Sequence, residues 1–93
     1  MIISFGDADT RRVWKGERVK RWPSGVQQLG RRKLRMLNNS ITLNDLLVPP
    51  GNRLEKLSGK LKQYYSIRIN EQWRIIFMWQ NGNAFEVAIT DYH

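Results

Sequence analysis

The chain has 93 residues, which is enough for a single domain over residues 1–93, and it lacks cysteine, which excludes a disulfide framework and a thiolate metal site. It shows neither a signal-peptide pattern nor an apolar run of the roughly 20 residues that span a membrane, so a soluble intracellular protein is expected. The formal net charge is +8, with ten basic and three acidic residues concentrated in residues 1–39, which favours a polyanionic partner, nucleic acid first and an acidic protein second.

The N-terminal part is expected to contain a strand and a short helix. Residues 1–5 are suited to a strand. Asp7 is suited to cap a helix from Ala8 to Lys15, which Gly16 ends. A basic connector over residues 17–22 then leads to the longest predicted helix.

That helix has the strongest periodic pattern in the chain and begins at Pro23 and Ser24. Ser24 and Gln27 fit the S-x-x-Q capping box. Lys33 interrupts the apolar face, and we expect its stem to lie along the edge of the core with its ammonium group in solvent. The apolar face comprises Val26, Leu29, Gly30, Leu34, Met36 and Leu37, and the opposite side carries Gln28, Arg31, Arg32 and Arg35.

The remaining sequence predicts a short helix followed by a meander of strands. Thr42 and Asp45 indicate a helix through residue 48, which Pro49 and Pro50 end before a turn at residues 51–52. Strands are predicted over residues 53–57, 64–69, 73–79 and 84–90, with Asn81-Gly82 as a two-residue hairpin turn. This order predicts an α+β fold, in which N-terminal helices pack on one face of a mostly antiparallel sheet of four to five strands.

Two arginines are predicted to lie opposite each other in the central hairpin. Pairing Ile69 with Trp73 puts the apolar residues of both strands on one face and Arg68 opposite Arg74 on the other. Like charges placed so destabilise a sheet by ~0.2–1 kcal/mol, unless an anion such as phosphate sits between the guanidinium groups. The alternative is neutralisation within the chain.

That alternative has specific candidates. Arg68 could pair with Glu71 or Glu55, and Arg74 with Asp91. One such salt bridge would remove the need for a bound anion. The residues alone leave the two interpretations equally balanced.

Other routes to chemistry are limited. A metal site is not expected, because the chain has one histidine and no cluster of carboxylates at ligand spacing, and it has no Gly-rich phosphate loop. The ending Asp91-Tyr92-His93 provides three groups able to handle or orient a proton, although a frayed terminus is the alternative. Strict alternation puts Arg74 on the face of Ile89 and Asp91, so Arg74 and Tyr92 converge only with a bulge, a strong twist or a tail that leaves the strand.

Three segments, PPGNRLEKLSG, YYSIRINEQWRIIF and the terminal DYH, together resemble the HigB-type toxins of the RelE superfamily. The resemblance covers most of the chain and is strongest from Pro49 onward. It implies a small basic ribonuclease that cuts messenger RNA, typically in the ribosomal A site. It also implies a HigA-type antitoxin with a helix-turn-helix domain. Operator DNA would be bound only through this antitoxin.

The resemblance also assigns roles to residues. Arg74, in QWRI, matches the arginine that contacts the scissile phosphate, and Arg68 lies on the adjacent strand, where relatives often place a basic group. Tyr92 and His93 match a C-terminal pair implicated in catalysis or substrate placement. Attack by the RNA 2′-hydroxyl would need neither a metal nor another cofactor.

The chain departs from the family in one segment. Some members have a histidine and a lysine where this chain has Glu55 and Ser58, so the resemblance does not identify the general base. Four basic residues surround this segment and could bind RNA, namely Arg53, Lys56, Lys60 and Lys62. Charge alone suggests Arg31 and Arg35 as contacts for the antitoxin.

Two rival functions fit the same charge and aromatic residues. One is a non-catalytic module that binds RNA or the ribosome. The other is an interaction protein that only partners an acidic chain or a DNA-binding regulator. Sequence-specific DNA binding by this chain itself is not expected, because no recognition helix is evident.

Overall fold

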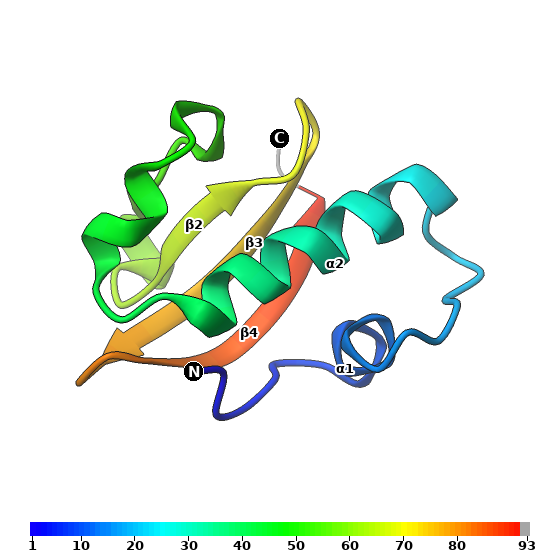
Figure 1. The fold of residues 1–93 in the computed structure, drawn as a ribbon, viewed down its shortest axis with the longest axis horizontal. Helices are drawn as coiled ribbons and strands as arrows, with labels where there is room; N and C mark the ends of the chain where they lie inside the picture. The colour runs from blue at the N-terminus through cyan, green and yellow to red at the C-terminus, as the bar shows by residue number, and fades with distance from the viewer. Residues whose placement is uncertain (92–93) are drawn as a thin grey trace.

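A computed structural model describes residues 1–91 and shows two α-helices on one face of a four-stranded antiparallel sheet (Figure 1). Helix α1 spans Ala8–Trp14 and α2 spans Ser24–Asn39, and the strands β1 (Glu55–Lys56), β2 (Tyr65–Arg68), β3 (Trp73–Gln80) and β4 (Asn83–Asp91) follow in that order across the sheet. The short 3-10 helices η1 (Leu43–Leu47), η2 (Pro50–Asn52) and η3 (Gly59–Leu61) lie in the connections between them. The predicted α+β class is confirmed. In this described range, no helix is long and apolar enough to cross a membrane.

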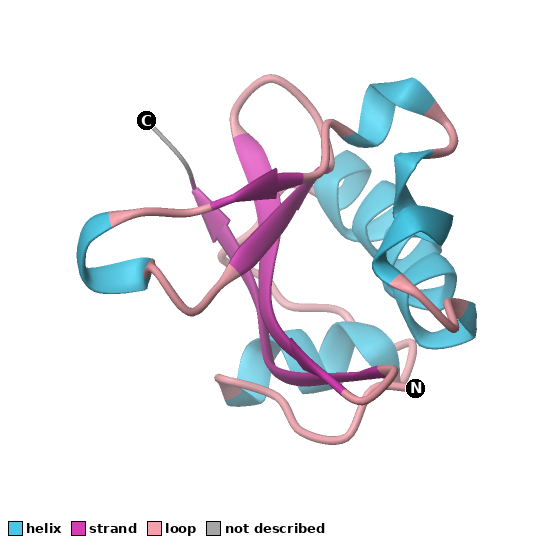
Figure 2. Cartoon of the chain, turned by 90° about the vertical axis from the view of Figure 1, so that its left-hand side faces the viewer, coloured by secondary structure: helices cyan, strands magenta, loops and turns pink. Residues whose placement is uncertain are grey.

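The sheet divides into a face covered by helices and a face that they leave open. Alternation along β2, β3 and β4 sends Ile67, Ile75 and Ile89 to the same face, where each is buried against the helices. Helix α2 comes very close to the sheet at Gly30, where an added Cβ would lie 3.3 Å from the Ile69 Cδ1. Figure 2 shows α2 on one side of the strands and η3 on the other. The buried core comprises Val13, Val19, Trp22, Val26, Leu34, Leu37, Leu46, Ile67, Ile69, Ile75, Phe77, Ala84, Val87 and Ile89.

The predicted strand over residues 1–5 is wrong. The segment makes only two isolated parallel bridges to β4, Ile2 with Ala84 and Phe5 with Val87. Between these bridges Glu86 has a φ of 52°, which breaks the regular spacing of β4, and its N–H donates to the Ser4 hydroxyl. A continuous ladder cannot form along a strand edge that is interrupted in this way.

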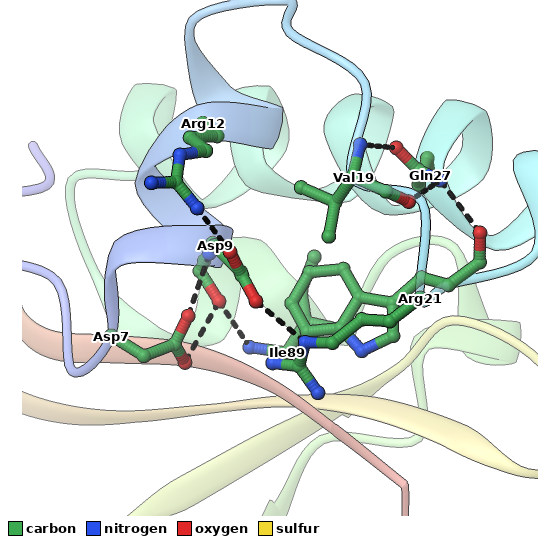
Figure 3. Close-up of polar contacts among 9 residues, drawn as sticks. Asp7, Asp9, Arg12, Val19, Arg21, Gln27 and Ile89 are labelled. Atoms are coloured by element: carbon green, nitrogen blue, oxygen red, sulfur yellow. Dashed lines mark hydrogen bonds and ion pairs between the residues drawn. The ribbon is translucent and has the colours of Figure 1, made fainter.

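The predicted capping box of α2 is also wrong. Pro23 is the N-cap residue and makes no side-chain capping bond. The Gln27 side chain instead turns inward, where it accepts from the Val19 N–H at 2.8 Å and donates to the carbonyls of Val19 and Trp22, both at 2.7 Å (Figure 3). Satisfying three backbone groups of a buried connector outweighs one cap on an exposed turn. Gln27 thereby fixes the connector on which Val19 and Trp22 enter the core.

Helix α1 is joined to the sheet by a buried hydroxyl. Asp7 caps the helix as predicted and accepts from the Thr10 N–H at 2.6 Å, while the Thr10 hydroxyl accepts from the Ile89 N–H at 2.9 Å. On the outside, Asp9 bridges Arg21 and Arg12 (Figure 3), and the hydrogen bond from Arg21, followed by that from Arg12, holds the pKa of this carboxyl below its usual value.

The short helix predicted from Thr42 is present as η1. Both halves of its capping box form, with Asp45 accepting from the backbone N–H groups of Thr42 and Ile41. These bonds lower the pKa of the Asp45 carboxyl. The hairpin turn is confirmed as well, because Asn81 and Gly82 both have positive φ, at 53° and 79°.

Replacing Gln27 with Ala is expected to destabilise the protein by about 1–3 kcal/mol for each backbone group left unpaired in the interior. Gln28→Ala is the matched control, because Gln28 is exposed on the same helix. Urea unfolding followed by circular dichroism measures both variants. Equal transition midpoints for the two would contradict the role given to Gln27.

Candidate functional site

The open face of the sheet carries a row of two arginines and a threonine. Arg68 of β2 is the register partner of Arg74 of β3, and Arg74 is the partner of Thr90 of β4. The predicted pairing of the two arginines is therefore confirmed. Arg74 is 8% exposed and Arg68 is half-buried, so both stems pack on the strands while the row lies away from α1 and α2.

A bulge in β4 sets which residues join this row. Ile76 pairs with Ala88 but Met78 pairs with Phe85, so two residues, Glu86 and Val87, oppose Phe77 alone. The bulge reverses the alternation, and Thr90 faces Arg74 in place of the expected Ile89 and Asp91. Asp91 lies opposite Trp73 instead.

The expected residues at the chain's end are only partly described. The Asp91 carboxylate accepts from the Gln72 side chain at 3.0 Å. Tyr92 and His93 lie outside the described residues.

The contacts of the two guanidinium groups differ. The Arg74 Nη2 donates to the Arg53 carbonyl at 2.8 Å, and the same nitrogen lies 3.8 Å from the Glu55 Oε1. The Arg68 Nε donates to the Asn70 carbonyl at 3.0 Å. Within residues 1–91 Arg68 makes no ion pair, so neither Glu71 nor Glu55 neutralises it there.

Glu55 reaches Arg74 across a small residue. It is the register partner of Ser66, which is fully buried and whose hydroxyl has no hydrogen-bond partner in the described part of the chain. A larger side chain at position 66 would stand between the carboxylate and the guanidinium. The site thus holds two guanidinium groups and one half-exposed carboxylate, which lies near Arg74.

The loop that provides the Arg53 carbonyl is anchored by the buried side-chain amide of Asn52. Asn52 is fully buried, and its Nδ2 donates to the Leu46 carbonyl at 3.1 Å and to the Met36 sulfur at 3.0 Å. Its Oδ1 accepts from the Lys33 ammonium at 2.5 Å. Arg53 follows directly in the left-handed conformation, with a φ of 45°, and offers its carbonyl to Arg74. A chain of polar contacts therefore links α2 to the arginine row.

The prediction that the Lys33 ammonium group lies in solvent is wrong. Its ammonium bonds to Asn52 inside this network, and burial lowers the pKa of the Lys33 ammonium. A turn residue was expected at position 52, and no sequence signal distinguishes a buried anchoring asparagine from an exposed one. Asn52 and Ser66 are parts of the site that the sequence did not reveal, and Glu55, considered from the sequence as a partner of Arg68, lies beside Arg74 instead.

The four predicted RNA-binding residues lie at different places around the site. Arg53 is exposed beside Arg74. Lys56 is the partner of Tyr65 and belongs by register to the opposite face, where its ammonium lies 4.7 Å from the centre of the Tyr65 ring and also donates to the Lys62 carbonyl. Lys60 and Lys62 are exposed at η3. Next to them is a cavity of about 240 Å³, lined by Glu55, Lys56, Leu57, Ser58 and Leu61.

Arg31 and Arg35 lie on α2, the helix that covers the face of the sheet opposite the arginine row. The Arg31 Nε donates to the Trp14 carbonyl at 3.3 Å, which joins the end of α1 to α2. Beside it lies a cavity of about 200 Å³ whose lining includes Arg18 and Gln28. Arg35 is exposed. In residues 1–91, no three metal-ligating side chains gather at one place.

The chain is similar to known proteins over most of its length. Residues 3–93 match the family model described as RelE-like toxin of type II toxin-antitoxin system HigB. The chain is 39% identical to Toxin HigB-1 of Vibrio cholerae over 90 residues, covering 96% of this chain and 95% of that protein. It is also 39% identical to Endoribonuclease HigB of Proteus vulgaris over 41 residues, covering 44% of this chain and 45% of the relative.

A solved structure supports the fold. The YoeB–YefM complex from Staphylococcus aureus contains a chain that superposes with a TM-score of 0.62 at 19% sequence identity. The match covers 100% of this chain and 98% of the other.

Replacing Asn52 with Ala is expected to lower the free energy of unfolding by about 1–3 kcal/mol, because the Leu46 carbonyl and the Lys33 ammonium lose a buried partner. The Arg53 carbonyl then loses its fixed position, so the Arg74 guanidinium protons should exchange faster with solvent in NMR spectra. Asn44→Ala, at an exposed position of η1, is the control. Unchanged Arg74 exchange in a destabilised Asn52→Ala protein would show that the amide stabilises the loop without orienting the arginine.

Proposed function

Because this chain belongs to the HigB-like family of RelE-like toxins of type II toxin-antitoxin systems, we propose that it is an endoribonuclease that cuts messenger RNA in the ribosomal A site. The whole of residues 1–93 acts as one domain in this proposal. The observation that supports it most directly is the pair of arginines held side by side on the open face of the sheet. The name of the Proteus vulgaris relative supports the same activity.

The proposed reaction is attack by an RNA 2′-hydroxyl on the neighbouring phosphate. Arg74 and Arg68 hold the phosphate oxygens and stabilise the negative charge that grows on them in the transition state. Guanidinium groups suit this role, because they remain charged at neutral pH and donate in a planar fork. The Arg53 carbonyl fixes one Arg74 nitrogen and so orients that fork before the substrate arrives. The proposed reaction uses neither a metal ion nor another cofactor.

Tyr92 and His93 complete the proposed catalytic set as proton donors or orienting groups. They directly follow β4, whose Thr90 stands beside Arg74. A positioned acid at the leaving oxygen contributes roughly 10²–10⁴ in rate.

Basic residues near β1 and η3 are proposed to hold the RNA backbone. Arg53, Lys56, Lys60 and Lys62 border the segment that carries Glu55. Phosphate contacts of this kind position a strand without reading its bases, so they contribute affinity that falls with added salt.

The proposed regulator is a HigA-like antitoxin with a helix-turn-helix domain. The YoeB chain used for comparison was solved with its partner YefM. We place the antitoxin contact at Arg31 and Arg35 on α2, where positive charge would attract an acidic segment. Operator DNA is then bound only through the antitoxin, and the complex acts in the prokaryotic cytoplasm.

Arg74→Ala is expected to abolish growth arrest and to slow cleavage of ribosome-bound messenger by about 10²–10³. Arg74→Lys should recover only part of the rate, because lysine keeps the charge but loses the fork. Arg32→Ala, at an exposed position of α2, is the control. Cleavage is measured by mapping the ends of messenger RNA after induction. Full toxicity of Arg74→Ala would contradict this site, and toxicity without cleavage by the wild type would favour a non-catalytic ribosome-binding module.

Reversing charge at Arg35 or Arg31 to Glu is expected to slow antitoxin association by about tenfold or more, with a weaker dependence on salt. Lys60→Glu is the control for net charge at a distant exposed position. Stopped-flow mixing with the antitoxin at several salt concentrations measures the rates. Equal slowing in all three variants would assign the effect to net charge and contradict a contact at α2.

A further inference from the structure

We propose that a cavity at the far end of the open face of the sheet binds one unpaired base of the RNA substrate, and that the Glu86 carboxylate at its rim favours a base with an amino group. This inference rests on the ribonuclease function proposed above and adds to it a determinant of sequence preference. The arginine row cannot provide one, because phosphate contacts position a strand without reading its bases.

The cavity lies on the same face of the sheet as the arginine row. Alternation along β3 puts Met78 on the face of Arg74, and Phe85, the register partner of Met78, joins it from β4. The cavity has a volume of about 350 Å³ and is lined by Gln63, Met78, Trp79, Gln80, Phe85 and Glu86. This volume lies near the lower end of the roughly 300–1,000 Å³ range of ligand pockets, which suits a single ring system.

The floor of the cavity is apolar, although neither α1 nor α2 covers this face. Met78 and Phe85 are half-buried, as is Ile76, which lies between Met78 and Arg74 on β3. Within residues 1–91 none of these three belongs to the buried core or packs against it. Unpaired RNA bases stack on aromatic rings, and the flexible, polarisable side chain of methionine adapts to a flat ring. The floor therefore suits a base.

The spacing along β3 fits a single RNA chain. Met78 is four residues from Arg74, a distance of about 13 Å at ~3.3 Å per residue. Stacked nucleotides rise by about 3.4 Å each and extended ones by more, so about two to four nucleotides separate the scissile phosphate from the cavity. The apolar pair of Ile76 and Ala88 occupies the strip between them. A chain held at the arginine row can therefore follow the face of the sheet to the cavity.

Glu86 places a negative charge at the rim, which a phosphate would avoid and a base can use. The side chain is exposed and makes no ion pair within residues 1–91. A carboxylate only accepts hydrogen bonds, so it pairs with donors such as the amino groups of cytosine and adenine. Uracil has an oxygen in place of the amino group of cytosine, and that oxygen would face a second acceptor. The rim therefore favours an amino-bearing base.

The backbone holds Glu86 in a fixed place. Glu86 lies in the β4 bulge with a φ of 52°, and its N–H donates to the Ser4 hydroxyl at 2.9 Å. Glycine and asparagine adopt this left-handed conformation with less strain than glutamate, so the bulge alone does not explain the residue type. Residues held in strained conformations cluster at binding sites. A binding role accounts for a glutamate at this position.

A side chain of the antitoxin is the alternative occupant of the cavity. RNA is favoured, because the cavity shares β3 and β4 with the arginine row, whereas the antitoxin contact proposed above lies on α2, which covers the other face. An unpaired carboxylate at the rim also suits an amino-bearing base better than the acidic segment proposed for the antitoxin.

Single-turnover cleavage of ribosome-bound messengers tests the proposal. The messengers carry cytosine or uracil at one position, scanned over the four nucleotides on each side of the cut. At one position the wild type is expected to cut the cytosine messenger about tenfold or more faster than the uracil messenger. Glu86→Gln should lose this preference, because an amide both donates and accepts. The control Glu71→Gln, which changes an exposed carboxylate in the 70–72 loop, should keep it.

Phe85→Leu tests the stacking floor separately. It is expected to slow cleavage about tenfold with either base, because leucine fills space but offers no ring. Affinity for the antitoxin, measured by titration, should not change. Circular dichroism spectra check that each variant is folded.

Three results would overturn the base pocket while the ribonuclease function stands. One is a wild type with no preference at any scanned position, and another is a preference that persists in Glu86→Gln. The third is a Phe85→Leu protein that cleaves normally but binds the antitoxin more weakly, which would assign the cavity to the antitoxin. A wild type that cleaves no RNA overturns the proposed function itself, and the pocket with it.

Discussion

The register between β2 and β3 is the constraint on which the site depends. That register is set by the apolar face, because a slip of one residue would expose Ile67, Ile75 and Phe77 to water. Each such side chain contributes about 1.5–3 kcal/mol when buried, whereas facing like charges cost ~0.2–1 kcal/mol. Hydrophobic burial therefore holds Arg68 against Arg74 even with no anion present. The Glu55 carboxylate, 3.8 Å from the Arg74 Nη2, offsets part of this repulsion, and a bound phosphate would relieve it further.

Two backbone irregularities bring further groups next to the paired arginines. The bulge at Glu86 and Val87 brings Thr90 into the arginine row, and the left-handed Arg53 turns its carbonyl toward Arg74. Both depend on the helical layer. Thr10 of α1 bonds the backbone of β4 at Ile89, and Lys33 of α2 bonds the asparagine that anchors the Arg53 loop. The packed side of the sheet thus fixes the geometry of its open side.

Much of this architecture could be predicted from the sequence, and the failures have physical reasons. Alternation and the Asn81-Gly82 turn predicted β2, β3 and β4 and placed the two arginines opposite each other, because period and turn chemistry are local properties. The role of Gln27 was missed, because a buried connector 5–8 residues away competes with the cap for the same side chain. From the sequence, a bulge is only one of the ways in which Arg74 and Tyr92 could converge. Its position could not be predicted, because Glu86 is not a residue type that favours positive φ. The contact between Glu55 and Arg74 across Ser66 depends on the alignment of β1, β2 and β3. A local sequence pattern carries no information about that alignment.

The edges of the sheet limit how another protein can attach to it. Exposed strand edges offer unpaired backbone groups on which a foreign strand can extend the sheet. Here the outer side of β4 is touched at Ala84 and Val87 by the chain's own first five residues, and β1 at the other edge is only two residues long. A strand from another chain would have to displace the N-terminal segment before it could run along β4. A partner that binds through side-chain contacts therefore needs less rearrangement of this chain than one that adds a strand to the sheet. The same covering of the sheet edges disfavours edge-to-edge aggregation of the protein.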